Sequence, residues 1–189
     1  MIEMNRAVAK VNSLFDTFNS TEELYSYLEG KKLYDLIYDI LSYRLTVSDM
    51  EAIKVIVDDV VNIFSDGKLN WEDSVLAISM ITNITSFVQR IIAQVDKAAI
   101  LDVENYRPIV KLLSAFFIVY YVKADRATKL SLLTTYLYAF DPLIRLATGL
   151  TFKFKGWIDG CCKGSKDIEQ QPQDSKKLLA ELKAVLNNE

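Results

Sequence analysis

Residues 108–122 read PIVKLLSAFFIVYYV, a stretch that leaves a helix almost no polar face. Pro108 is typical of the first turn of an α-helix, where the missing backbone N–H costs nothing. A helix that is apolar on nearly every side must be covered by neighbouring elements. The stretch therefore predicts a central helix that ends near Val122 and is enclosed by the rest of the protein.

Helices are also expected on both sides of this stretch, because apolar residues recur at intervals of three and four positions. With only three prolines and six glycines in 189 residues, long helices are rarely interrupted. The chain is thus expected to be all-α. The predicted helices cover about residues 3–18, 20–30, 32–44, 48–66, 71–96, 108–122, 125–140, 142–150 and 175–186.

Several helix boundaries are marked by residues that commonly cap helices. Two pairs, Ser20 with Glu23 and Ser48 with Glu51, have the spacing of a capping box, in which two side chains accept hydrogen bonds from free backbone donors. The remaining signals are Gly30 and Gly67 after helices, Asn70 and Asp125 as N-caps, and Asp141 before Pro142 as the start of a separate helix at an angle.

The predicted architecture is an irregular or orthogonal bundle of about eight or nine helices. Residues 1–158 form the helical domain, residues 159–174 a flexible linker, and residues 175–189 a C-terminal amphipathic helix. An isolated helix of about 12 residues is marginal in water, so the last helix needs a surface to pack against. The predicted partner-binding face of this helix consists of Leu178, Leu179, Leu182, Val185 and Leu186.

The sequence lacks the residues on which most catalytic and metal sites depend. Histidine, the commonest general base and metal ligand, is absent. The only two cysteines, Cys161 and Cys162, are adjacent, which offers neither a disulfide framework nor a CxxC motif. We therefore predict a non-enzymatic protein with no catalytic residue, no cofactor and no metal ion.

The charge balance argues against a nucleic-acid partner. The chain has 22 basic and 25 acidic residues, with a net charge of −3. A base-stacking platform needs a basic groove, so the ten tyrosines are predicted to be semi-buried residues that pack between helices. The first residues lack the pattern of a secretory signal, which predicts a cytoplasmic protein.

One loop, between the fourth and fifth predicted helices, resembles the calcium loop of the EF-hand family. Asn62, Asp66, Gly67 and Asp73 stand at positions one, five, six and twelve of that pattern. The resemblance implies a calcium site, but Phe64 stands where the family supplies an oxygen ligand. The alternative interpretation is a plain turn at Gly67 between two helices.

Aromatic, basic and cysteine residues gather late in the chain and form a candidate membrane-surface segment. Three contributions to the free energy of membrane binding add together: burial of aromatic rings, attraction of lysines to anionic headgroups, and an acyl chain on cysteine. The apolar runs are shorter than the about 20 residues of a membrane span, and the alternative is that these rings close the core. The predicted membrane-surface residues are Phe152, Lys153, Phe154, Lys155, Trp157, Cys161, Cys162, Lys163 and Lys166.

Taken together, the sequence favours a structural or interaction protein that packs against other protein subunits, in a homo-oligomer or a hetero-oligomer. The most specific form of this prediction is a minor capsid or scaffold component of a virus-like cage, located in the host cytoplasm or the virion. A first alternative is a peripheral membrane adaptor that uses the segment around Cys161 and Cys162. A second alternative is an apolar ligand carrier, or an enzyme, with a cavity between the helices predicted over 108–122 and 125–140.

Overall fold

The structure is a computed structural model that describes residues 2–95, 103–160, 180 and 184. In this part of the chain it contains seven α-helices, one short 3-10 helix and no strand, which confirms the all-α prediction. The helices are α1 (Ile2–Thr17), α2 (Thr21–Glu29), α3 (Leu33–Leu41), α4 (Val47–Ile63), α5 (Ser74–Val95), α6 (Val103–Tyr121) and α7 (Arg126–Gly160), and η1 (Trp71–Asp73) precedes α5.

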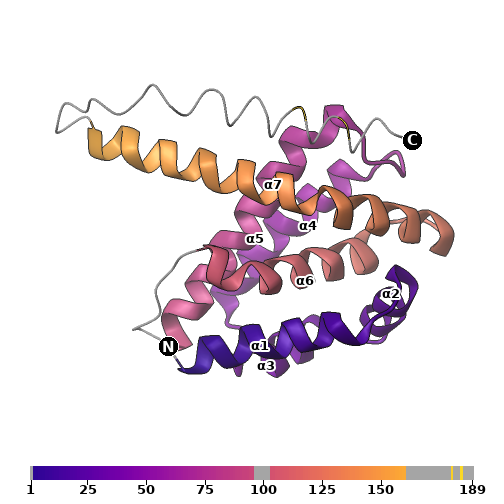
Figure 1. Ribbon diagram of the computed structural model, residues 1–189, viewed down its shortest axis with the longest axis horizontal. Helices are drawn as coiled ribbons and strands as arrows, with labels where there is room; N and C mark the ends of the chain where they lie inside the picture. The colour runs from indigo at the N-terminus through magenta and orange to yellow at the C-terminus, as the bar shows by residue number, and fades with distance from the viewer. Residues whose placement is uncertain (1, 96–102, 161–179, 181–183, 185–189) are drawn as a thin grey trace.

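The helix α6 is the centre of the bundle. In Figure 1 it lies between α1 and α7, while α4 and α5 cross behind these helices at a steep angle. The helices α1, α2, α4, α5 and α7 all pack against α6. The prediction of an enclosed central helix is therefore confirmed. The buried side chains of α6 include Ile109, Val110, Leu112, Leu113, Ala115, Phe116, Phe117, Ile118 and Val119.

The prolines do not mark the helix starts that the sequence predicts. Pro108 lies inside α6, which already begins at Val103, and Pro142 lies inside the continuous helix α7. The predicted separate helix from Pro142 is therefore wrong. An internal proline costs about 3 kcal/mol, but burial of one large apolar side chain contributes about 1.5–3 kcal/mol. Phe140, Leu143 and Ile144 are all buried around the proline, and their packing outweighs its cost.

The first predicted capping box forms only in part, because Glu23 binds the N–H of Asn19 rather than that of the N-cap Ser20, and the second box is displaced. At the start of α2, the Ser20 hydroxyl accepts from the Glu23 N–H at 3.3 Å, and the Glu23 carboxylate accepts from the Asn19 N–H at 2.9 Å. At the start of α4, the box is formed by Thr46 and Asp49. The predicted pair Ser48 and Glu51 is therefore wrong.

The loop before α5 is a turn whose side chains bind its own backbone. Gly67 has a φ of +75°, a conformation that favours glycine. The Lys68 N–H donates to Asp66 at 2.9 Å, and the Asn70 N–H donates to Asp73 at 2.9 Å. The carboxylates of Asp66 and Asp73 thus stabilise the backbone of the loop, which favours the interpretation as a plain turn. Within the described residues, no three acidic or cysteine side chains gather in a group that suits a metal ion.

The C-terminal predictions lie mostly outside the described residues. The helix α7 continues to Gly160, past the predicted start of the linker at residue 159. The rest of the linker lies outside the described part, as do Leu178, Leu179, Leu182, Val185 and Leu186. In the predicted last helix, Ala180 and Ala184 are helical and exposed.

Candidate functional site

The most distinctive surface feature is a group of exposed large side chains on α3, the first turn of α4 and the end of α6. We call this group the tyrosine patch. Tyr34, Tyr38 and Tyr120 each leave about half of their surface exposed, and Val47 is 86% exposed. Soluble proteins tolerate single exposed apolar side chains, whereas a contiguous group marks an interaction site. The patch consists of Tyr34, Tyr38, Val47, Met50 and Tyr120.

One contact within the patch joins two of its helices. The Tyr34 hydroxyl donates to the Met50 thioether at 3.2 Å, which links α3 to α4. The ring of Tyr120 lies 5.2 Å from the ring of Tyr121 in an edge-to-face arrangement. Burial raises the pKa of the Tyr121 hydroxyl, and the neighbouring Tyr120 and Tyr34 raise it further. The Tyr34–Met50 bond thus joins α3 to α4, and the influence of Tyr34 on Tyr121 indicates that the end of α6 lies near α3.

Local sequence explains why these tyrosines face outward. The buried apolar residues of α3 lie on one face of the helix. The opposite, exposed face carries Tyr34 and Tyr38 one turn apart, together with Asp35 and Asp39. The prediction that the tyrosines are semi-buried is wrong for Tyr34, Tyr38, Tyr120 and Tyr138, which expose about half of their surface or more. The acidic neighbours in α3 are the signal that identifies its outward face.

Behind the start of α4 lies a buried polar network centred on Asp49. This carboxylate is fully buried and accepts from the Thr46 N–H at 2.7 Å and the Thr46 hydroxyl at 2.8 Å. The Arg90 guanidinium of α5 donates to it at 2.7 Å. The Tyr43 hydroxyl lies 2.9 Å from both Asp49 and Gln94. The network fastens the loop between α3 and α4 to α5.

Hydrogen bonding dominates the ionisation of this network. Burial by itself would raise the pKa of Asp49, because water no longer solvates the charge. The donors on Thr46 and Tyr43, together with Arg90, outweigh that effect and hold the pKa of Asp49 below its ordinary value. Burial and the bond to Asp49 raise the pKa of Tyr43. The pair is therefore an ionised carboxylate and a neutral phenol at neutral pH, which suits a structural tie.

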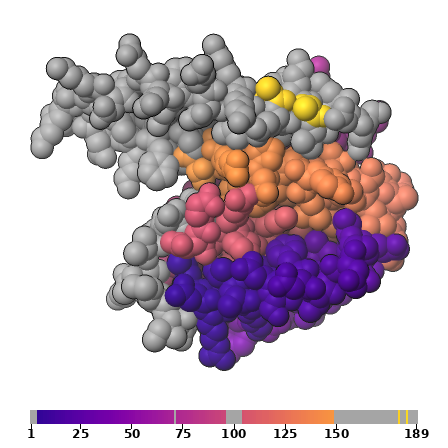
Figure 2. All heavy atoms as spheres, viewed as in Figure 1, coloured from indigo at the N-terminus to yellow at the C-terminus, as the bar shows by residue number. Residues whose placement is uncertain are grey.

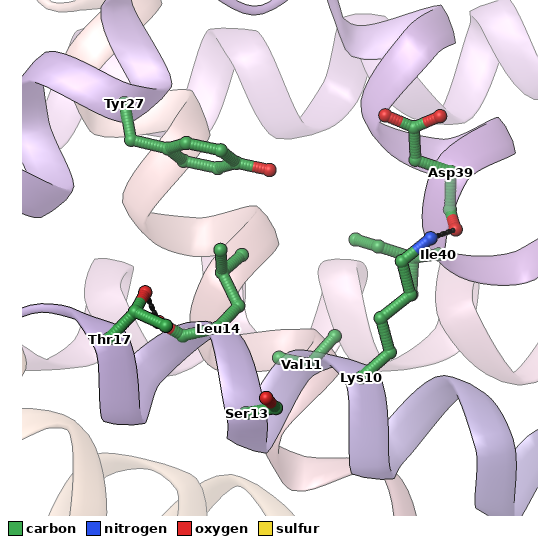
Figure 3. Close-up of a pocket in the computed structure, with 8 residues that line it drawn as sticks. All are labelled: Lys10, Val11, Ser13, Leu14, Thr17, Tyr27, Asp39 and Ile40. Carbon is green, nitrogen blue, oxygen red and sulfur yellow. Dashed lines mark hydrogen bonds between the residues drawn. The ribbon is translucent and has the colours of Figure 1, made fainter.

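A shallow groove lies between α1 and α3. Figure 3 shows the Tyr27 ring pointing into it, while the Lys10 ammonium crosses to the backbone carbonyl of Asp39 at 2.5 Å. The two adjoining parts of the groove enclose about 230 Å³ and about 160 Å³. Ligand pockets usually enclose about 300–1,000 Å³, so each part is smaller than a typical small-molecule site.

Of the predicted membrane-surface residues, the structure shows only the backbone of the first five. Residues 152–157 belong to the helical backbone of α7. The side chains of Phe152, Lys153, Phe154, Lys155 and Trp157 lie outside the described part, as do the residues Cys161, Cys162, Lys163 and Lys166.

One helix of the described part, α5, is long and apolar enough to cross a membrane. Half of its most apolar stretch is buried against the other helices. Core helices of bundles share this length and composition, and α5 packs against α4, α6 and α7.

Comparison with known proteins gives no relative for this arrangement. The chain matches no protein-family model, and neither a curated protein nor a solved structure matches it.

Proposed function

We propose that this protein is a non-enzymatic interaction protein that acts as a subunit of a larger assembly. The observation that carries the proposal is the tyrosine patch. Tyrosine and methionine are enriched in protein interfaces, because they offer a large contact area. The patch contains three tyrosines and a methionine, all exposed.

The construction of the patch supports binding to a protein surface. A tyrosine has a rigid ring with a polar tip, so it buries much area while its hydroxyl still finds a partner. The Asp49 network ties the first turn of α4, which carries Val47 and Met50, to α5. A rigid surface loses less conformational entropy on binding than a loose one.

The patch can be tested by substitution with a matched control on the same protein. The double substitution Tyr38→Ser and Tyr120→Ser removes two patch rings, and Tyr138→Ser removes an exposed ring of α7 outside the patch. Interface tyrosines are commonly worth about 1–2 kcal/mol each, so the double variant should weaken association at least about tenfold. The control should leave association unchanged.

The measurement is size-exclusion chromatography with light scattering on the full chain over a wide concentration range. We expect assemblies that the double variant shifts to smaller species. For a hetero-assembly, a photo-crosslinking residue at position 38 should form adducts in producing cells, and one at position 138 should not. The proposal is contradicted if the protein is a monomer at every concentration and positions 38 and 138 form adducts equally.

The most specific form of the proposal is a minor capsid or scaffold component of a virus-like cage. A compact helical subunit with an exposed contact surface suits such a shell. Electron microscopy of the purified assemblies tests this form, since closed particles of uniform size support it. Small open oligomers contradict the cage while leaving the interaction proposal intact.

A peripheral membrane adaptor is the second candidate function, and the shape of α7 favours it. Figure 1 shows the C-terminal end of this helix projecting beyond the ends of α5 and α6. The last three turns of α7, which ends at Gly160, include Lys153 and Lys155, and lysines suit anionic headgroups. Flotation with anionic and neutral vesicles tests it. Binding that is lost in the double variant Lys153→Glu and Lys155→Glu supports the adaptor, and flotation of neither protein contradicts it.

A further inference from the structure

The outer side of α4 carries a row of residues with the spacing of a coiled-coil seam. Met50 is 41% exposed and Val61 is 37% exposed, while Val57 is partly buried against the core. The row shares Met50 with the tyrosine patch and extends that surface along α4. We call it the α4 seam, and its members, at intervals of four, three and four positions, are Met50, Lys54, Val57 and Val61.

Two acidic residues accompany the α4 seam on one flank. Glu51 directly follows Met50, and Asp58 directly follows Val57, so both acids stand at the same position of the seven-residue repeat. Both are exposed, and neither forms an ion pair with another described residue. Charged residues at this position pair with charges on the partner helix in coiled coils. The α4 seam therefore favours a helix that carries basic residues seven positions apart.

The amphipathic helix predicted over residues 175–186 has this pattern in its sequence. Leu179, Leu182 and Leu186 follow one another at intervals of three and four positions. Lys183 directly follows Leu182, and Lys176 stands seven positions before Lys183, at the same position of the repeat. The two lysines therefore accompany the leucine row as Glu51 and Asp58 accompany the α4 seam.

The two described residues of this segment are consistent with such a helix. Ala180 and Ala184 are helical and exposed. At 3.6 residues per turn, both alanines lie on the side of the helix away from the leucine row. Their exposure leaves the leucine row free to be the face that packs.

An antiparallel pairing matches the charges of both helices in one register. Glu51 then lies opposite Lys183, and Asp58 lies opposite Lys176. Both pairs form together because the acids and the lysines have the same spacing of seven positions. A parallel pairing would place equivalent flanks on opposite sides of the seam, so the acids and the lysines would not meet.

The same register also aligns the apolar residues. The lysine in the α4 seam suits it as well, because a long aliphatic stem covers apolar surface while the ammonium group stays in water. A single lysine within a seam is known to specify the register at a cost in stability. The resulting layers join Met50 with Leu186, Lys54 with Leu182, and Val57 with Leu179.

We propose that residues 175–186 of a second copy of this chain pack antiparallel on the α4 seam. This inference rests on the proposed assembly function and names the partner of the surface around Met50. A second copy is the occupant because the single chain leaves Met50 and Val61 exposed.

The arrangement of the helices supports exchange between copies. Figure 2 shows α7 and the first helices of the chain on opposite sides of the narrow strip where α6 reaches the surface. In Figure 1, α7 and α3 lie on opposite sides of α6. The segment that follows α7 thus starts on the side of the molecule away from α3, whose Tyr34 binds Met50.

Charge reversal followed by mixing tests the proposal on the full chain. The acid variant carries Glu51→Lys and Asp58→Lys, and the lysine variant carries Lys176→Glu and Lys183→Glu. Each variant alone places like charges across the seam, so its association should weaken at least about tenfold. An equimolar mixture places opposite charges across the seam again and should associate like the wild type. Light scattering at low ionic strength measures the association.

Two control variants have the same changes in net charge away from the seam. Asp16→Lys with Glu72→Lys matches the acid variant, and Lys68→Glu with Arg145→Glu matches the lysine variant. All four residues are exposed. These controls should associate like the wild type, and their mixture sets the baseline for attraction between proteins of unlike net charge. The lysine variant changes no residue of α1 to α7, so its comparison with its control decides the question if the acid variant folds poorly.

Three outcomes overturn the proposal, and they separate it from the assembly function. If both reversal variants associate like their controls while Tyr38→Ser with Tyr120→Ser weakens association, this docking is wrong and the interaction function stands. If the mixture associates no better than either variant alone, the segment does not bind a second copy. If the wild type is a monomer at every concentration, both this docking and self-assembly are wrong.

Discussion

Replacement of Asp49 by alanine is expected to be among the most destabilising substitutions of a polar residue in this protein. The carboxylate is fully buried, and four hydrogen bonds from Thr46, Tyr43 and Arg90 converge on it at 2.7–2.9 Å. Removing one partner of a buried ion pair costs about 3–5 kcal/mol, because the other charge is left without compensation. The Arg90 side chain is 39% exposed, so water can replace part of the loss. We expect about 3 kcal/mol for Asp49→Ala.

The nearby residues provide a graded control series. Thr46→Ala removes the other half of the capping box and should cost about 1 kcal/mol. Glu51 fits the same sequence pattern but is exposed, so Glu51→Ala should change the free energy of unfolding by no more than about 0.5 kcal/mol. Equilibrium unfolding in urea, followed by circular dichroism at neutral pH, measures all three variants. A cost for Glu51→Ala equal to that of Asp49→Ala would refute the assigned box.

The same carboxylate predicts the direction of the pH dependence. The pKa of Asp49 is lower in the folded protein than its ordinary value of 3.8, so the unfolded chain binds the proton more readily. Its contribution to stability is therefore complete above the unfolded pKa and is lost as the pH falls through the folded pKa. The difference in stability between wild type and Asp49→Asn should shrink when the pH is lowered below about 4. A difference that is constant from pH 7 to pH 2 contradicts this reasoning.

Three further substitutions test the packing and the turn by the same unfolding measurement. Phe117→Ala should cost about 3–5 kcal/mol, because the ring is fully buried in the central helix, and a cost below 1 kcal/mol would contradict its placement. Gly67→Ala should cost about 1–2 kcal/mol, because φ is +75° and the new Cβ would lie 3.3 Å from the Thr128 methyl group; a neutral change would contradict the positive φ. Thr85→Val should be neutral or stabilising by about 1 kcal/mol, because the buried Thr85 hydroxyl has no partner among the described residues; destabilisation would reveal a bond that this hydroxyl makes.

Much of the helical pattern is predictable because it is local. The five apolar residues of the third predicted helix, Leu33, Leu36, Ile37, Ile40 and Leu41, are the five that α3 buries. The Ser20 N-cap and the Asp125 N-cap also form as predicted, with the Glu23 N–H donating to Ser20 at 3.3 Å and the Thr128 N–H donating to Asp125 at 3.0 Å. These features depend on residues within one or two turns of each other.

The features that sequence reasoning missed depend on distant partners. Both Thr46–Asp49 and Ser48–Glu51 satisfy the capping pattern, and only Asp49 also binds Arg90, which lies 41 positions away. A local pattern contains no information about that contact. The outward position of Tyr120 is equally invisible in the sequence, because its neighbours Val119 and Tyr121 are apolar and aromatic.

The position of α6 has a consequence for the synthesis of the protein on the ribosome. Four of the helices that pack against α6 precede it in the chain, but α7 follows it. During synthesis, the apolar side of α6 that packs against α7 stays exposed to water until α7 has left the exit tunnel of the ribosome. A nascent chain that stops before Arg126 is therefore expected to bind chaperones through the side of α6 that α7 covers in the folded protein.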